Sequence, residues 1–333
     1  MSSKKLNYIQ LLRAIAAIAV VIFHASVATT KYSDFPSRFI DFFKFGTYGV
    51  DLFFVISGFV IYYANDDTPP GMFIRRRLER IVPIYWILTL LAVPFAYRSA
   101  SAQFTWLKLA ESLGFVSFLG ESSPVLYVGW TLEFEMFFYI SAAASMLLMR
   151  HRWRAVCMAI SCLVGMGALM QTSGPIANFL TAQIMLEFLA GIVIGQIVKN
   201  RRVEWIEVAF IGVASALVVI LKQDFRLLWL GVPSAFLVWC AASAGDRGLP
   251  KWIVTLGDAS YSIYLIQVFT VSACGQLVHL VYPHLDPEVL IALATLLTVC
   301  AGVASYKLIE SPIQRWFRNL RRQGSSRRAQ QLE

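Results

Sequence analysis

Long apolar runs separated by short polar segments dominate the hydrophobic pattern of this chain. Most runs are roughly 20 residues long, the length at which an α-helix crosses the hydrocarbon core of a bilayer. Residues 104–120 are amphipathic and too short to span, so we expect them to lie at the membrane interface or to form a short re-entrant segment. The pattern therefore predicts an all-α integral membrane protein with about ten transmembrane helices, at residues 8–30, 45–64, 80–97, 128–149, 154–172, 176–198, 204–221, 226–244, 254–279 and 288–308.

Composition supports this class of protein. Hydrophobic residues make up 58% of the chain and charged residues only 15%, whereas a soluble protein of this length needs more charged surface to stay in solution. The five cysteines all lie inside apolar runs, without a CxxC pair or a histidine at metal-ligand spacing. We therefore expect neither a disulfide framework nor a metal site.

Positive charge is distributed unevenly between the loops. With the N-terminus in the cytoplasm, 20 Lys and Arg residues lie in cytoplasmic segments and 7 in outer segments. The positive-inside rule then predicts that both termini are cytoplasmic and that the number of spans is even. This topology accounts for the net charge of +9. The basic residues are spread over six cytoplasmic patches rather than one face, which argues against a nucleic-acid partner.

Two ionisable residues interrupt the first apolar run. Arg13 and His24 are eleven residues apart, about three helical turns, so both side chains project from nearly the same face, roughly 16 Å apart along the axis. Ionisable groups in a membrane helix are costly and face a protein interior or a wet path. We therefore predict a functional site along this face. Arg13 also argues against the alternative that this run is a cleaved signal peptide.

The second span has an aspartate near its outer end. Two interpretations of Asp51 are open. It can meet His24, which lies near the outer end of the first span, and hold the imidazole in one tautomer. Alternatively it stabilises the N-terminal end of its own helix, where a carboxylate is favoured.

The third and fourth spans carry further charged groups. Arg77 and Arg80 are three residues apart and share a helix face, where two guanidinium groups form a phosphate clamp or, alternatively, a plain positive-inside anchor. In the fourth span, Glu133 and Glu135 point to nearly opposite sides and cannot both serve one site. Glu135 shares its face with two hydroxyl-bearing residues, at positions 131 and 139.

Six segments, in order over almost the whole chain, together resemble the membrane-bound acyltransferase family often called acyltransferase family 3. The segments are Arg13…His24, Gly49-Val-Asp-Leu-Phe-Phe-Val-Ile-Ser-Gly-Phe59, Arg77-x-x-Arg80-Ile-x-Pro83, Trp130-Thr-Leu-x-x-Glu135-x-x-x-Tyr139, Leu256-Gly-Asp-Ala-Ser-Tyr-Ser262 and Glu310-Ser-Pro312-x-x-Arg315. The opening residues 6–17 are most similar to the branch that modifies exopolysaccharides. In the ninth span this chain has Gln267 where many relatives carry a histidine.

The resemblance implies a ten-helix O-acyltransferase in the inner (plasma) membrane. It implies that an acyl group, expected to be acetyl, moves from cytoplasmic acyl-CoA to a hydroxyl of a polysaccharide, oligosaccharide or lipid-linked glycan, without a metal. Polysaccharide assembly machinery is a possible further partner. We expect the acyltransferase domain to cover residues 1–312 and a basic cytoplasmic tail to follow at 313–333.

The resemblance also assigns roles to the candidate residues. His24 is expected to be catalytic, together with Asp51 and Glu135, and Arg77 and Arg80 are expected to bind the acyl-CoA donor, with Arg13 beside them. His24 acts either as a general base on the acceptor hydroxyl or as a nucleophile that is itself acylated. Two other classes remain open: a transporter or flippase, and a non-catalytic subunit of a polysaccharide assembly complex.

Overall fold

The computed structural model describes residues 6–65, 68–98, 104–120, 123–149, 152–171, 173–200, 204–244 and 248–330. Every regular element in these ranges is a helix. Nine of the described helices are long and apolar enough to cross a membrane. The prediction of an all-α membrane protein is therefore confirmed. The spanning helices are α1 (Asn7–Tyr32), α3 (Tyr48–Asn65), α4 (Pro70–Arg98), α6 (Trp130–Leu148), α7 (Arg152–Leu169), α9 (Met185–Asn200), α10 (Trp205–Lys222), α13 (Ser260–Val281) and α14 (Pro287–Ser305).

Shorter helices connect and extend these spans. The expected span at 226–244 is a shorter apolar helix, Leu227–Ser243, in which the π-helical turn η4 leads into α11. The other short elements are α2 (Ile40–Phe43), η1 (Lys44–Thr47), α5 (Trp106–Leu113), η2 (Ser117–Gly120), η3 (Tyr127–Gly129), α8 (Pro175–Leu180), η4 (Leu227–Gly231), α11 (Val232–Ser243), α12 (Lys251–Asp258), η5 (Tyr306–Glu310) and α15 (Ser311–Gln330).

The segment at 104–120 does not span, in agreement with its short amphipathic pattern. Its helix α5 packs on α4, where the Tyr85 hydroxyl donates to the carbonyl oxygen of Ser112 at 3.1 Å and the Trp86 indole donates to Leu113 at 3.0 Å. The backbone N–H of Ser117 donates to the carboxylate of Glu133 at 2.8 Å. Glu133 therefore fastens this segment to the start of α6.

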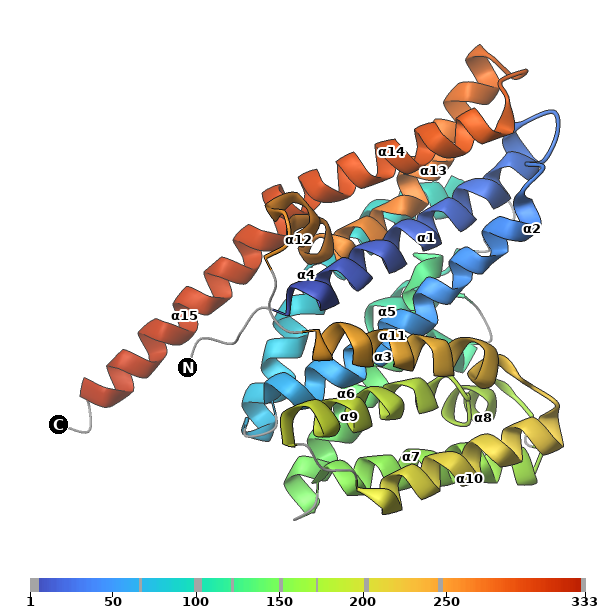
Figure 1. Cartoon of the computed structure of the whole chain (residues 1–333). Helices are drawn as coiled ribbons and strands as arrows, with labels where there is room; N and C mark the ends of the chain where they lie inside the picture. The colour runs from blue at the N-terminus through green and yellow to red at the C-terminus, as the bar shows by residue number, and fades with distance from the viewer. Residues whose placement is uncertain are drawn as a thin grey trace.

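The spans form two groups that meet along α1 and α3 (Figure 1). In one group α1 packs against α12, α13 and α14, and in the other α3 packs against α9 and α11, with α7 and α10 beyond. The first turn of α1 and the C-terminal helix α15 lie at the same end of the bundle (Figure 1).

Glycines allow α3 and α9, in the second group, to approach closely. A Cβ on Gly58 of α3 would lie 1.9 Å from the carbonyl oxygen of Phe188 on α9, and one on Gly191 would lie 2.1 Å from that of Val55. The backbones of α3 and α9 are in direct contact at these positions, so a side chain larger than that of glycine does not fit there. Such contacts are typical of small-residue packing in membranes.

An ion pair joins α3 to the turn η4 within the bundle. The Arg226 guanidinium donates from Nε to Asp51 Oδ1 at 2.9 Å and from Nη2 to Asp51 Oδ2 at 3.0 Å. The Asp51 side chain is fully buried, whereas that of Arg226 is 38% exposed. Glu187 of α9 also interacts with both groups. The bidentate geometry compensates for the burial of the Asp51 charge.

The two glutamates at the start of the seventh span, α10, have polar partners inside the protein. Glu207 is fully buried, and the Gln196 amide of α9 donates to it at 2.6 Å. Glu204 lies just before the helix and pairs with Arg154. Each carboxylate near the start of α10 therefore has a polar partner from a neighbouring segment.

The C-terminal helix continues the line of α14 (Figure 1) and also contacts α4. Arg321 of α15 forms an ion pair with Glu79 of α4, which Arg75 also contacts at 2.8 Å. The expected basic tail therefore begins as a helix rather than as an irregular segment.

The charge bias predicts which ends of the bundle face the cytoplasm. Several of the Lys and Arg residues behind it (Lys4, Lys5, Arg150, Arg201, Arg202 and Arg247) lie outside the described residues. In a cysteine-free background, we expect an impermeant maleimide to label Lys44→Cys in intact cells and Arg315→Cys only after permeabilisation, since both positions are exposed. Labelling of both from the same side would refute the topology.

The Asp51–Arg226 pair predicts a stability effect. In Arg226→Gln the buried Asp51 carboxylate loses its positively charged partner. We therefore expect the free energy of unfolding in detergent to fall by about 3 kcal/mol. This is the low end of the range for a broken buried ion pair, because Arg226 is partly exposed. The double variant Asp51→Asn/Arg226→Gln should recover most of this loss. Equal stability of Arg226→Gln and the unchanged chain would show that the pair does not stabilise the fold.

Candidate functional site

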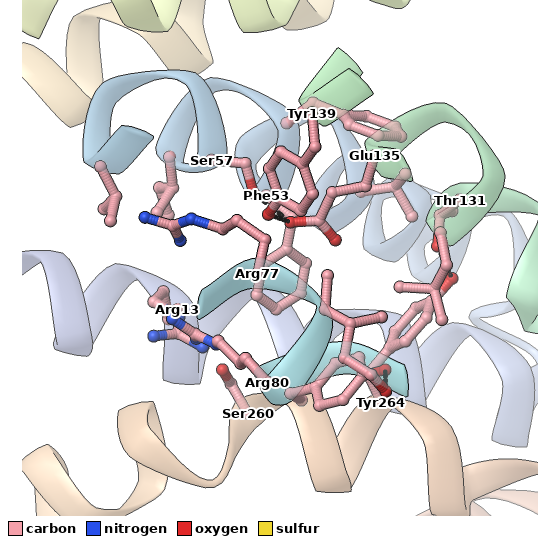
Figure 2. Close-up of a pocket in the computed structure, with 17 residues that line it drawn as sticks. Arg13, Phe53, Ser57, Arg77, Arg80, Thr131, Glu135, Tyr139, Ser260 and Tyr264 are labelled. Carbon is pink, nitrogen blue, oxygen red and sulfur yellow. Dashed lines mark hydrogen bonds between the residues drawn. The ribbon is translucent and has the colours of Figure 1, made fainter. Parts of the chain in front are cut away.

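One pocket lies where α1, α3, α4, α6 and α13 meet. Its empty volume is about 800 Å³, counted with the part open to solvent, which suits a small-molecule site. Five of the six motifs singled out in the sequence contribute side chains to it, from all five helices (Figure 2). The lining residues are Arg13, Val50, Phe53, Phe54, Ile56, Ser57, Val60, Arg77, Arg80, Ile81, Thr131, Leu132, Glu135, Tyr139, Ser260, Tyr261 and Tyr264.

Three arginines gather at one side of the pocket. Arg77 and Arg80 come from the same face of α4, as their spacing predicts, and Arg13 comes from α1 (Figure 2). Arg80 repels Arg13, and the carboxylates of Glu310, Asp258 and Glu135 attract Arg13 more weakly. Like charges are held together in this way when a site is built for an anion.

Arg77 is held in place by aromatic rings. Its guanidinium carbon lies 5.8 Å from the ring centre of Phe73 and 5.6 Å from that of Tyr139. The side chain is buried, and its Nε has no hydrogen-bond partner among the described residues. Cation–π contacts therefore fix the position of the guanidinium at the edge of the pocket.

Glu135 is the one carboxylate among the residues that line the described pocket. Its Oε1 accepts hydrogen bonds from Ser57 at 3.2 Å and from the Tyr139 hydroxyl. The described residues supply no partner for Oε2, and Figure 2 shows the carboxylate between the arginines and Thr131. The expected separation of the two glutamates is confirmed, because Glu133 points to Ser117 instead.

His24 is not among the residues that line the pocket. Its Nδ1 is 2.9 Å from the carbonyl oxygen of Val20. Because a carbonyl only accepts, Nδ1 carries the hydrogen, and the lone pair of a neutral ring lies on Nε2. Nε2 has no partner among the described residues, and the ring packs against Tyr127 with 5.5 Å between ring centres. The imidazole is thus set up to accept a proton at Nε2.

A short network links His24 to the pocket. The carbonyl oxygen of Val128, the residue after Tyr127, accepts hydrogen bonds from Thr131 at 3.1 Å and from Tyr264 at 3.0 Å. Both of these hydroxyl groups line the pocket on the side away from the arginines (Figure 2). Arg13 and His24 share one face of α1, so the arginines, the hydroxyl groups and His24 follow one another along the bundle.

The structure pairs Asp51 with Arg226 rather than with His24. The expected contact is unnecessary for the imidazole, because the backbone of its own helix already fixes its tautomer. Asp51 does lie in the first turn of α3, as the alternative interpretation requires. Sequence reasoning missed Arg226 and Tyr127, whose roles depend on contacts between distant segments.

Other residues of the motifs support the site from outside. Ser262 donates to Glu310 at 2.5 Å and Gln314 donates to the same carboxylate at 2.9 Å. The Tyr261 hydroxyl donates to the carbonyl oxygen of Ile81 at 3.0 Å and joins α13 to α4. No group of three or more His, Cys, Asp or Glu side chains that suits a metal ion occurs in the described ranges.

Comparison with known proteins shows which family the chain belongs to. The sequence pattern of the family described as "Acyltransferase domain" matches residues 6–307. The chain is 33% identical to the exopolysaccharide production protein ExoZ of Rhizobium meliloti (strain 1021), over 89% of this chain and 95% of that protein. No solved structure matches the chain. The family match covers every residue that lines the pocket as well as His24, and we conclude that this protein belongs to acyltransferase family 3.

Proposed function

We propose that this protein is an O-acyltransferase of the inner (plasma) membrane that moves an acyl group, expected to be acetyl, from cytoplasmic acyl-CoA to a hydroxyl of a surface polysaccharide or lipid-linked glycan. The observation that carries the proposal is one pocket with three arginines on one side and, beyond its other side, a histidine with a free Nε2. The similarity to a protein named for exopolysaccharide production supports a glycan as the acceptor.

The arginines suit the phosphate groups of a CoA donor. Arg13, Arg77 and Arg80 carry three positive charges against the single carboxylate of Glu135 in the pocket wall. Guanidinium groups bind phosphate through paired, charge-assisted hydrogen bonds. By the charge-based topology they lie towards the cytoplasm, where acyl-CoA is made.

The middle of the pocket suits the pantetheine arm of the donor. Phe53, Phe54 and Ile81 form an apolar wall, and Glu135 is held by Ser57 and Tyr139. The pantetheine arm carries amide N–H groups that require acceptors. We infer that the free oxygen of Glu135 accepts one of them and so positions the thioester.

His24 is placed to act as the general base. As the acceptor hydroxyl attacks the thioester carbonyl, its proton passes to Nε2, and the imidazolium returns this proton to the sulfur as the C–S bond breaks and CoA leaves. The Val20 carbonyl remains bonded to Nδ1–H and stabilises the imidazolium that forms. For Asp51 we infer a positioning role, since its carboxylate reaches the site only through the packing of α3.

Loss of either α4 arginine should weaken donor use. In Arg77→Ala and Arg80→Ala, a charge-assisted hydrogen bond to phosphate is removed, which contributes about 1.5–3 kcal/mol. We expect at least a roughly tenfold rise in the apparent donor constant, measured with radiolabelled acetyl-CoA and purified protein. Arg318→Ala, on the exposed part of α15, is the matched control and should leave the constant unchanged. An unchanged donor constant in both pocket variants would leave these arginines as topological anchors only.

Loss of the imidazole should remove acyl transfer. We expect His24→Ala to lower transfer to the glycan by about a hundredfold to ten-thousandfold, because the proton acceptor is missing. Glycan acylation is measured in cells that contain equal amounts of each variant. His279→Ala is the control, since His279 is exposed near the end of α13. Near-normal acylation in His24→Ala would exclude His24 from the reaction and would contradict the proposed mechanism.

A further inference from the structure

Two hydroxyl groups form an isolated pair at the side of the pocket away from the arginines. The Thr131 and Tyr264 oxygens are 3.0 Å apart, and both lie within 3.1 Å of the carbonyl oxygen of Val128. Both side chains are buried, at 8% and 7% exposure, yet both line the pocket. They come from different spans, α6 and α13, and converge on one point (Figure 2).

The number of hydrogens in this pair matters. Each hydroxyl supplies one hydrogen, so the pair has two, and a single one is enough to satisfy the Val128 carbonyl. The second hydrogen lies between the two oxygens or on the same carbonyl, and rotation of its C–O bond turns it towards the pocket. The pair can therefore donate to a ligand without leaving a buried carbonyl unpaired, which would be costly.

The position of the pair matches the place where negative charge develops. A donor held by the arginines extends across the pocket towards Thr131 and Tyr264, and Tyr127, next to Val128 in sequence, contacts the ring of His24. The carbonyl under attack must lie between the anchored donor and the proton acceptor. The hydroxyl pair occupies that interval.

We propose that Thr131 and Tyr264 together stabilise the oxyanion of the acyl-transfer intermediate, an inference that rests on the proposed function. When the acceptor oxygen bonds to the thioester carbon, the carbonyl π electrons move to its oxygen, and the freed hydroxyl hydrogen binds that charge. When the carbonyl re-forms, the C–S bond breaks and the thiolate leaves. Thr131 and Tyr264 neither gain nor lose a proton overall.

Shared use of one free hydrogen predicts a non-additive result. In Thr131→Val or Tyr264→Phe the remaining hydrogen must serve either Val128 or the oxyanion, so each single variant should lose most of the stabilisation. We expect kcat to fall about a hundredfold to a thousandfold in each, the range typical of an oxyanion donor. The double variant should be no more than about threefold slower than the slower single variant, as for groups that act as a unit.

Donor binding and a matched pair of hydroxyl groups are the controls. The dissociation constant for CoA should stay within about threefold of the starting value in all three variants, since the arginines are untouched. Thr131→Ser, which keeps a hydroxyl, should retain most of kcat. Thr298→Val removes a buried hydroxyl that lies 2.7 Å from Thr270 outside the pocket, and it should leave kcat unchanged.

The outcomes separate this inference from the proposed function. Single variants that retain kcat within threefold, losses that multiply in the double variant, or losses that appear in CoA binding instead of kcat would each overturn the inference while leaving the acyltransferase proposal in place. A Thr131→Ser variant as slow as Thr131→Val would overturn it as well. Absence of acyl transfer by the unchanged chain would refute the proposed function, and this inference with it.

Discussion

A charged side chain inside a membrane must be solvated by the protein, and this constraint organises the interior of the bundle. Asp51 is matched by Arg226, Glu207 by Gln196, and Glu310 by Ser262 and Gln314. Each of these contacts joins helices that are distant in sequence or fixes one helix end. The carboxylates thereby become part of the packing, since a buried charge without a partner would cost several kcal/mol.

In the pocket, by contrast, positively charged side chains outnumber the carboxylates that line it. Three arginines share a space in which Glu135 is the single lining carboxylate of the described residues. Aromatic rings hold Arg77, and its Nε lacks a protein partner. An excess of arginine over carboxylate among the lining residues is typical of an anion-binding site, although Glu310 and Asp258, outside the pocket wall, also attract Arg13. The same pocket becomes polar but uncharged at Thr131 and Tyr264, so its two sides suit different parts of one elongated ligand.

The sequence predicted what depends on local periodicity and failed where distant segments decide. Apolar run length located the spans, and helical spacing placed Arg77 with Arg80 and Glu135 with Tyr139 on common faces. The partner of Asp51 is Arg226, 175 residues away, at the start of the predicted span 226–244. Likewise, no local pattern shows that the backbone of α1 satisfies His24, or that Tyr127 packs on its ring.

The contact between α15 and α4 has a consequence for the arginines. Glu79, which Arg321 holds, lies between Arg77 and Arg80 in the same helix. Docking of the C-terminal helix and occupation of the pocket therefore act on one rigid element. By thermodynamic reciprocity, a ligand that favours this placement of α4 strengthens the docking of α15, and conditions that release α15 weaken the ligand by the same factor. The ion pair thus connects the basic C-terminal helix to the same helix that carries Arg77 and Arg80.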